Sequence, residues 1–357
     1  MKINDVTIKN YRNIEDIYFE PFEGVNIIYG ENAQGKTNIL EAMFLFTGLK
    51  SFRSSKDSEL LQFGKSQSKI NIGFETSSRE HKAEIKITDR RRASLNGVSL
   101  KSPTELMSKF PAALFSPGFM SLIQSGPSER RKFIDSAICQ IKPKYAVILS
   151  EYTKLVKQRN AVLKDNEDIK SVRLFLECIN ESFCSLGEEI YKERKAYLEL
   201  LLPYAGEIYS GLSSGKEEIS FTYLKKGCHS ENESLSDILK NHERADISAK
   251  MTLTGPHRDD IEININSVSA RSFGSQGQKR SAAIALKLSE AQVIKNIIGE
   301  EPVIFLDDVM SELDTARQDY ILNHIKDRQV FITCCDPASI LRMSEGKTFN
   351  IKDGRLV

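Results

Sequence analysis

The sequence lacks the features that would place a chain in a membrane or outside the cell. Among its 357 residues no apolar run approaches the length of about 18 residues that a membrane-spanning helix needs. The first residues, Met1 to Asp5, already follow a strand pattern and include no apolar segment of the signal-peptide kind. These absences predict a cytoplasmic protein with no membrane partner.

Cysteine and histidine are scarce and scattered. The six cysteines form no C-x-x-C pair, and none of the five histidines stands at ligand spacing from them. This pattern is typical of reduced thiols and argues against both a disulfide framework and a metal–cysteine site.

An excess of charge of either sign is also missing. Fifty basic and 49 acidic residues leave a formal net charge of +1, so any binding to a polyanion must come from local patches. Hydrophobic residues make up 40% of the chain, which is ordinary for a folded protein. The length suggests one large domain with an elaboration, or two domains.

What is present is a complete G-x-x-x-x-G-K-[ST] string between an apolar run and a helical pattern. Such a P-loop turns backbone N–H groups and a helix N-terminus towards a polyphosphate. We expect Lys36 to contact the β- and γ-phosphates and Thr37 to hold Mg²⁺. The predicted nucleotide-binding residues of the loop are Gly30, Glu31, Asn32, Ala33, Gln34, Gly35, Lys36, Thr37 and Asn38.

A second candidate element ends in two carboxylates. Four apolar residues from Val303 to Leu306 precede Asp307 and Asp308, which reads as a buried parallel strand that delivers acids to the sheet edge. We expect Asp307 to hold Mg²⁺, directly or through water, and Asp308 to polarise the attacking water. With Lys36, Asp308 is the predicted catalytic residue.

Two kinds of periodicity predict the surrounding architecture. Alternation within residues 1–29 and 70–100 favours short strands, and Asn96-Gly97 is a strong hairpin turn. Apolar stripes from Tyr145 to Val162 and from Val172 to Ile190 step by three and four, which indicates two antiparallel helices around a charged tip at residues 164–168. Whether this pair protrudes as an arm of about 30 Å or packs into a compact domain stays open.

A third element joins glycines to a strong helix former. Ser275 and the neighbouring glycines place hydroxyl and backbone donors at a helix start, a second predicted anion site. A plain N-cap would explain Ser275 and leave the repeated glycines without a reason. Upstream, His257 and Arg258 belong to a polar turn and could serve a buried network or the surface.

These strings together carry a resemblance. Ser275-Gln276-Gly277-Gln278 resembles the signature motif of ATP-binding-cassette (ABC) ATPases, and Ser311 to Asp314 resembles their D-loop. Within that superfamily the chain is similar to the bacterial RecF family over essentially its whole length. The stretches that carry this similarity are residues 10–13, 30–38, 115–117, 126–131, 254–260, 275–280 and 306–314. The string Gly255 to Asp260 and the Asp-Asp ending are the most specific of them.

The resemblance implies a fold and an activity. The expected fold is α/β, an ABC-type P-loop ATPase head with a mixed β-sheet and a short antiparallel helical arm. The expected division is a head of residues 1–125 and 205–357 and an arm of residues 126–204. ATP and Mg²⁺ are the implied cofactors, and Arg12, Ser275, Gly277 and Gln278 join the nucleotide-binding residues. Ser275 would act in trans, on ATP held by the P-loop of a second copy.

The resemblance further implies an ATP-dependent homodimer that binds single-stranded, gapped or junction DNA and acts with RecR and RecO to load RecA. Such proteins serve replication, recombinational repair and SOS induction. Transport ATPases usually have Glu where this chain has Asp308, and His where it has Cys335, which predicts slow hydrolysis used as a switch. A transporter's nucleotide-binding subunit is the alternative function, and a small-molecule kinase would leave the signature helix unexplained.

DNA contact rests on charge alone. Basic residues on loops and on the helical pair could contact phosphates, with salt-sensitive binding and little sequence preference. A charge run is more often a solvated face. The candidates are Arg53, Arg90, Arg91, Arg92, Arg130, Arg131, Lys154, Lys157 and Arg159.

Overall fold

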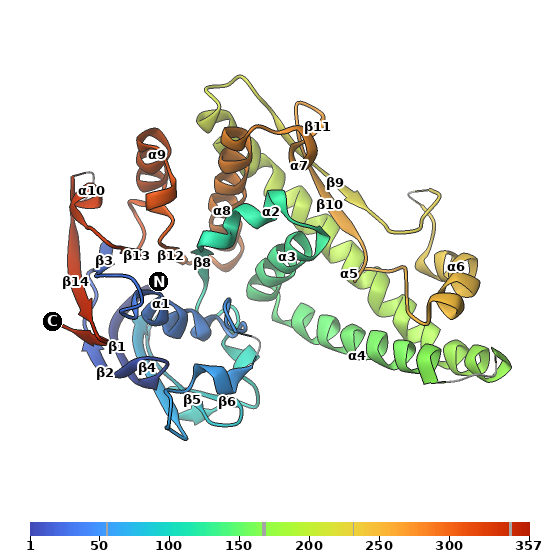
Figure 1. Cartoon of the computed structure of the whole chain (residues 1–357), viewed down its shortest axis with the longest axis horizontal. Coiled ribbons are helices and arrows are strands. Elements are labelled where there is room, and N and C mark those ends of the chain that lie inside the picture. Colours follow the sequence, from blue (N-terminus) through green and yellow to red (C-terminus); the bar gives the residue numbers. More distant parts are fainter. Residues whose placement is uncertain (55, 166–168, 231, 343–344) are drawn as a thin grey trace.

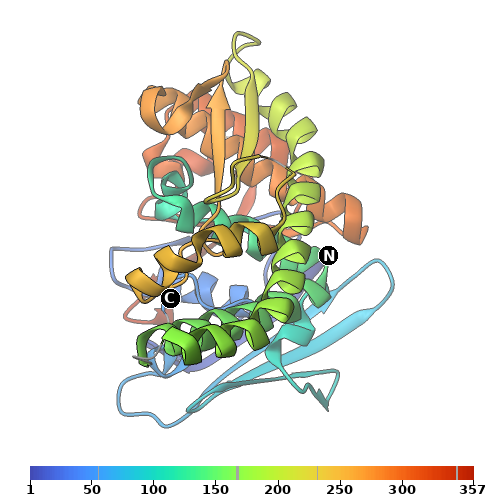
Figure 2. The ribbon, with the colours of Figure 1, turned by 90° about the vertical axis from the view of Figure 1, so that its right-hand side faces the viewer.

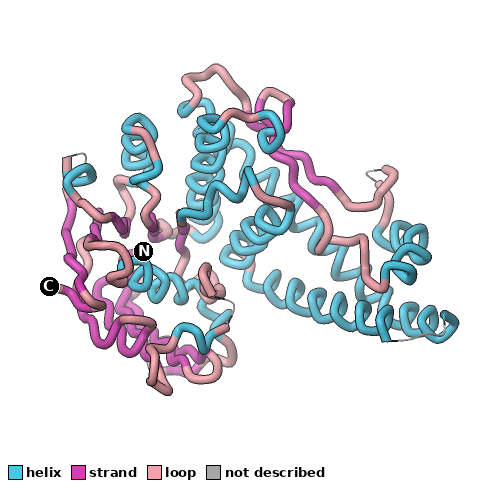
Figure 3. Tube along the Cα trace, viewed as in Figure 1, coloured by secondary structure: helices cyan, strands magenta, loops and turns pink. Residues whose placement is uncertain are grey.

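Three sheets and a helical part build the described part of the molecule, for which we use a computed structural model. The structure describes residues 1–54, 56–165, 169–230, 232–342 and 345–357. Figure 3 shows that most strands gather around the two termini, while the opposite end is mainly helical. The strands are β1 (Lys2–Tyr11), β2 (Ile14–Phe19), β3 (Val25–Tyr29), β4 (Ser68–Glu75), β5 (Glu80–Ile87), β6 (Arg91–Leu95), β7 (Val98–Ser99), β8 (Ala112–Phe115), β9 (Ile219–Leu224), β10 (Asp260–Ile265), β11 (Val268–Ser269), β12 (Val303–Asp307), β13 (Val330–Cys334), β14 (Gly346–Lys352) and β15 (Arg355–Leu356).

The helices differ widely in length. They are α1 (Lys36–Phe44), α2 (Ser121–Gln124), α3 (Pro127–Ile141), α4 (Pro143–Asp165), α5 (Ile169–Leu212), α6 (Leu235–Ala249), α7 (Ala270–Phe273), α8 (Gln276–Ile298), α9 (Thr315–Ile325) and α10 (Ala338–Leu341). One-turn 3₁₀ helices lie at Leu45–Thr47, Asp57–Leu60, Pro103–Leu106, Pro117–Met120 and Met310–Glu312.

The central sheet has the strand order β15-β14-β3-β13-β12-β8 and is parallel from β14 to β8. β15 pairs antiparallel with β14 and makes the sheet mixed. Successive residues of β3 face opposite sides: Ile27 packs into a core with α8 and α5, whereas Ile28 packs with α1 and β1. Burial on both faces explains why β12 and β13 begin with runs of apolar residues instead of alternating.

A second, antiparallel sheet covers α1. Its order is β2-β1-β4-β5-β6-β7. Ile39, Leu40 and Met43 of α1 are fully buried between this sheet and the central one. At the turn before β7, Asn96 and Gly97 have φ of 51° and 79°. Both residues are therefore left-handed, as a two-residue hairpin loop requires, and the predicted hairpin is confirmed.

The helical pair extends away from the two six-stranded sheets (Figure 1). Helices α4 and α5 pack side by side, with Leu163, Val172 and Leu176 forming a small core near their joined end. With 23 residues, α4 is about 35 Å long. Figure 2 shows α6 lying across this region beside α5. Of the predicted charged tip, residues 166–168 lie outside the described part of the chain.

The long helix α5 crosses the expected division of the chain. It runs for 44 residues to Leu212, through Pro203, and packs against α8 of the head. Such packing compensates for the hydrogen bond that a proline cannot donate. The predicted boundary between residues 204 and 205 therefore falls inside a helix, and the division into head and arm stays a prediction.

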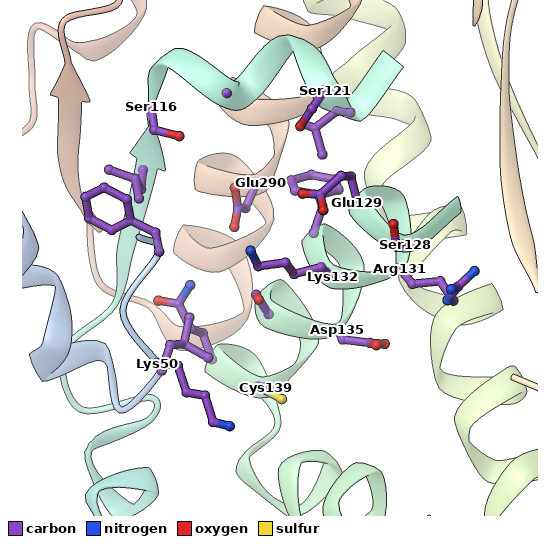
Figure 4. Close-up of a pocket in the computed structure, with 18 of the residues that line it drawn as sticks. Lys50, Ser116, Ser121, Ser128, Glu129, Arg131, Lys132, Asp135, Cys139 and Glu290 are labelled. Carbon is purple, nitrogen blue, oxygen red and sulfur yellow. The ribbon is translucent and has the colours of Figure 1, made fainter. Parts of the chain in front are cut away.

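A cavity of about 690 Å³ lies between the head and the helical part. Figure 4 shows Lys132 of α3 and Glu290 of α8 at this cavity, with Lys50 on the loop that follows the first helix. Within the described part of the chain, its lining includes no residue of the P-loop. The cavity is thus separate from the predicted nucleotide site.

Candidate nucleotide site

The P-loop joins β3 to α1, as the strand–turn–helix pattern predicts. Its glycines are required by geometry. At Gly30 a Cβ atom would lie 2.3 Å from the Ile351 carbonyl oxygen, and Gly35 has a φ of 114°. No side chain caps the first turn of α1, so this helix start is open towards an anion.

Lys36 folds back across the loop. Its Nζ atom donates to the carbonyl oxygens of Gly30 and Glu31, at 2.6 and 2.9 Å, and lies 3.6 Å from Cys335 Sγ. The residue is 7% exposed. The ammonium group is thereby held over the loop backbone, where a P-loop lysine contacts phosphates.

The two predicted magnesium ligands meet although the sequence separates them widely. Thr37 Oγ1 lies 2.7 Å from Asp307 Oδ1, and Thr333 Oγ1 donates to the same oxygen at 2.8 Å. Burial raises the pKa of Asp307, and the bonds from the two threonines oppose that rise. A hydroxyl and a carboxylate suit Mg²⁺, which usually takes few protein ligands and completes its shell with water and phosphate. The residues present therefore fit the implied metal.

Asp308 leaves the strand in a left-handed conformation. Its φ is 52°, and its N–H donates to Thr333 Oγ1 at 2.9 Å. Ser311 donates to the Asp308 carbonyl oxygen at 2.9 Å, which ties the acid to the start of the D-loop. Ser311 Oγ also lies 3.3 Å from Asp308 Oδ1. Its predicted role in activating water stays a prediction.

Several contacts of the P-loop were not predicted from the sequence. Asn13 donates to the Ala33 carbonyl oxygen at 3.3 Å and accepts from Asn38 at 2.7 Å. Cys335 lies 3.3 Å from Asn32 Oδ1. The hairpin between β14 and β15 donates N–H groups of Asp353 and Gly354 to Gln34. Asn13 stood in one of the strings that carry the resemblance, and that position was the only signal for it.

Arg12 has a more internal place than expected. Its guanidinium forms two bonds to the fully buried Glu41 carboxylate, at 2.5 and 2.7 Å, and a further bond to Ser54 Oγ at 2.6 Å. These bonds fasten the end of β1 to α1, directly behind the P-loop. A contact between Arg12 and nucleotide stays a prediction.

Ser275 begins α8 in a capping box. Its Oγ accepts from the Gln278 N–H at 3.2 Å, and Gln278 Oε1 accepts from the Ser275 N–H at 2.7 Å. Gln278 also donates to Glu217 at 2.6 Å. Ser275 is exposed, and Figure 1 shows α7, just ahead of it, well separated from α1. Contact of Ser275 with a P-loop would therefore need a second copy of the chain.

The predicted DNA contacts divide by burial. Arg130 pairs with both oxygens of Asp260 at 2.8 and 3.0 Å, and Arg159, 1% exposed, donates to Asp246 at 2.6 Å. Arg91 donates to the Leu49 carbonyl oxygen at 2.6 Å. These three arginines have internal partners, which disfavours a contact with phosphate because a buried, paired guanidinium is costly to expose; their contact with DNA stays a prediction without support from the structure.

The other candidates remain accessible to different degrees. Arg53 donates to Asn38 at 2.7 Å and so lies at the P-loop helix. Arg131 is half-buried and donates to the Asp259 carbonyl oxygen. Figure 4 shows Arg131 and Lys132 on different sides of α3. Arg90, Arg92, Lys154 and Lys157 are exposed.

The chain is similar to known proteins over nearly its whole length. Residues 2–353 match the family described as RecF/RecN/SMC N terminal domain. The chain is 37% identical, over 366 residues, to the DNA replication and repair protein RecF of Clostridium acetobutylicum, covering 100% of this chain and 99% of that one. It is 37% identical over 363 residues to the RecF of Lachnospira eligens, with the same coverage.

Solved structures show the same similarity in three dimensions. The recombination mediator protein RecF bound to ATP in the RecFOR pathway superposes with a TM-score of 0.88 at 35% identity, covering 100% of this chain and 97% of that one. An SMC head bound to the C-terminal winged-helix domain of ScpA has a TM-score of 0.58 at 16% identity, again covering 100% and 97%. The second similarity concerns the fold alone.

Proposed function

The chain belongs to the RecF family within the RecF/RecN/SMC group, and from this premise we propose that it is an ATP-dependent DNA-binding protein of replication and recombinational repair. ATP with Mg²⁺ binds at the P-loop and drives the formation of a homodimer. Slow hydrolysis then reverses the dimer, so that ATP acts as a switch. This works because ATP stabilises the dimer more than the monomer.

The observation that carries the proposal is the contact between Thr37 and Asp307 at 2.7 Å. It joins the first turn of the P-loop helix to the end of the acidic strand and supplies two oxygen ligands for one Mg²⁺. Bound Mg²⁺ would neutralise charge on the phosphates. Lys36 would hold those phosphates from the loop, and Asp308 would orient the attacking water.

DNA and the partner proteins extend the proposal. We infer binding to single-stranded, gapped or junction DNA, and cooperation with RecR and RecO in loading RecA, including during SOS induction. Support comes from the RecF relatives and from the RecFOR pathway to which the ATP-bound RecF structure is assigned. The transporter alternative is not favoured, because the similarity to RecF spans the whole chain. Among the described helices, none combines the length and apolar character that crossing a bilayer requires; the cytoplasmic location stays a prediction.

The test is the fluorescence anisotropy of a labelled, gapped duplex titrated with the protein at one fixed salt concentration. We expect binding to tighten at least about tenfold when ATP and Mg²⁺ are added, a change of about 1.4 kcal/mol. The Lys36→Ala variant should lose both this tightening and the ATP-driven dimer. A dimer that persists unchanged in Lys36→Ala would show that Lys36 does not serve ATP. Absence of DNA binding by the wild type in both states would contradict the DNA proposal for the isolated protein.

A further inference from the structure

One side chain joins the two motifs that the proposed dimer would present to its partner. Arg317 lies in the first turn of α9, directly after the D-loop (residues 311–314). Its Nη2 atom donates to the Gly277 carbonyl oxygen at 3.1 Å, and its Nε and Nη2 atoms donate to Ser281 Oγ at 3.2 and 3.1 Å. On the other side, Nη1 donates to the Asp314 carboxylate. The guanidinium thus bridges the signature helix and the D-loop.

The fit around this guanidinium is close. Ser281 is only 4% exposed, and a Cβ atom at Gly277 would lie 3.2 Å from Arg317 Nη2. The choice of glycine at position 277 is therefore explained by packing as well as by the N-cap, since a larger residue would crowd the Arg317 guanidinium. A planar fork of donors can serve both Gly277 and Ser281, whereas the single nitrogen of lysine cannot reproduce that geometry.

The D-loop is fastened at its other end as well. Gln318 Nε2 donates to the carbonyl oxygens of Met310 and Leu313, at 2.6 and 3.1 Å. Ser311 donates to the Asp308 carbonyl oxygen. A continuous set of contacts therefore runs from Asp308, through the D-loop and Arg317, to the start of α8, which Ser275 caps.

We propose that Arg317 is a positioning residue that holds Ser275 and the D-loop in one fixed arrangement for the ATP bound by a second copy of this chain. The inference rests on the proposed ATP-driven dimer. Arg317 itself contacts neither phosphate nor metal. Its effect is carried in trans, because the helix start that it fixes is separated from the P-loop of its own subunit (Figure 1).

Mixing two inactive variants tests the direction of this effect. Lys36→Ala binds no ATP but keeps an intact signature face, whereas Arg317→Ala binds ATP but presents a displaced one. In a mixed dimer, the ATP of the Arg317→Ala subunit meets the intact face of the Lys36→Ala subunit. Each mixed dimer has one complete site of two, held by the ATP of the Arg317→Ala subunit, so the mixture should hydrolyse ATP faster than either variant alone.

Controls separate failure of the inference from failure of the proposed dimer. The mixture of Ser275→Ala with Lys36→Ala should recover in the same way. If the wild type does not dimerise with ATP, or if this Ser275 mixture does not recover, the proposed dimer is wrong. If the Ser275 mixture recovers and the Arg317 mixture does not, Arg317 acts on its own subunit and the inference is overturned.

Two further measurements exclude a merely structural role. Arg317→Ala should keep the ATP affinity of the monomer within about twofold of the wild type, as a contact outside the bound ligand predicts. The matched control is Arg173→Ala, which removes an exposed arginine that pairs with Glu243 on α6 and should leave hydrolysis unchanged. Wild-type hydrolysis by Arg317→Ala alone, or an equal loss of monomer ATP affinity, would contradict the positioning role.

Discussion

At the scale of single residues, His257 shows how a polar turn becomes part of a buried network. The sequence left open whether His257 and Arg258 serve the surface or the interior. In the structure His257 Nδ1 lies 2.9 Å from the Tyr152 hydroxyl, and Nε2 lies 3.4 Å from the Thr252 carbonyl oxygen. Nearby, Arg194 donates to the Pro256 carbonyl oxygen at 2.7 Å. The turn therefore fastens the helical pair to β10.

This environment makes His257 a source of acid sensitivity. Burial lowers the pKa of His257 from 6.5 to about 4, and the charges of Arg258, Arg131 and Arg159 act in the same direction. The folded protein thus favours the neutral ring. The stability that depends on the neutral ring is complete above pH 6.5 and is lost as the pH falls towards about 4.

We predict that the melting temperature falls between pH 6.5 and pH 4 more steeply in the wild type than in His257→Asn. Asparagine can keep a bond to Tyr152 without titrating, so the difference isolates the imidazole. The pKa shift corresponds to at most about 3 kcal/mol of unfolding free energy. Melting curves at matched ionic strength measure it. Parallel pH profiles for the two proteins would contradict the assignment.

At the scale of elements, the start of α8 serves two purposes. The capping box of Ser275 and Gln278 satisfies N–H groups of the first turn, which accounts for Ser275 as an N-cap. The neighbouring glycines have separate reasons. A Cβ atom at Gly274 would lie 2.5 Å from the Ala270 carbonyl oxygen, and Gly277 borders the Arg317 bridge. The cap and the proposed contact with a second copy of the chain therefore fall on the same residue, Ser275.

The two purposes can be separated by substitution. Ser275→Ala should lower the unfolding free energy by about 1 kcal/mol through loss of the cap. It should also weaken the ATP-driven dimer while leaving ATP binding by the monomer nearly intact. Ser275→Asp should restore the cap but not the dimer, since its carboxylate would repel a phosphate. Melting curves, nucleotide titrations and sedimentation of the three proteins measure these effects.

Either of two results would contradict the trans role of Ser275. If Ser275→Ala lowered monomer ATP affinity as much as it lowered dimer formation, Ser275 would act within its own subunit. If Ser275→Asp formed the ATP dimer as well as the wild type, no phosphate would lie opposite this residue.

At the scale of the whole molecule, the helical arm carries both buried and exposed basic residues. Arg159 of α4 is buried against Asp246 of α6, whereas Lys154 and Lys157 of the same helix are exposed. The buried pair fixes α6 against the helical pair and needs both partners, because a lone buried charge is costly. The exposed lysines remain accessible to a polyanion.

We predict that the double variant Lys154→Gln and Lys157→Gln weakens binding of gapped DNA in the ATP state. If both lysines contact phosphates, the slope of log affinity against log salt should fall in magnitude by about 2. The matched control is Lys101→Gln with Lys326→Gln, two exposed lysines outside the arm. Anisotropy at several salt concentrations measures the slopes. Equal slopes for the wild type and the arm variant would exclude α4 from the DNA contact.

The sequence by itself determined the local parts of this protein. Strand–turn–helix order, the Asn96-Gly97 hairpin and the acidic strand follow from patterns within about ten residues, where backbone sterics and burial leave little choice. The meeting of Thr37 with Asp307, 270 positions apart, was predictable for a different reason, the topology of a parallel sheet. Thr37 follows β3 and Asp307 ends β12, and both strands belong to the parallel part of the sheet, with their carboxyl ends at one edge.

Only the tertiary structure decided which charged side chains are buried and paired inside the protein. Arg130 and Arg159 read like Lys154 and Lys157 in the sequence, since all four stand on helices with mixed charge. Their carboxylate partners lie 130 and 87 positions away, at Asp260 and Asp246. The same holds for the bridge from Arg317 to Gly277 and for the passage of α5 through Pro203. These outcomes depend on long-range packing, which local periodicity does not encode.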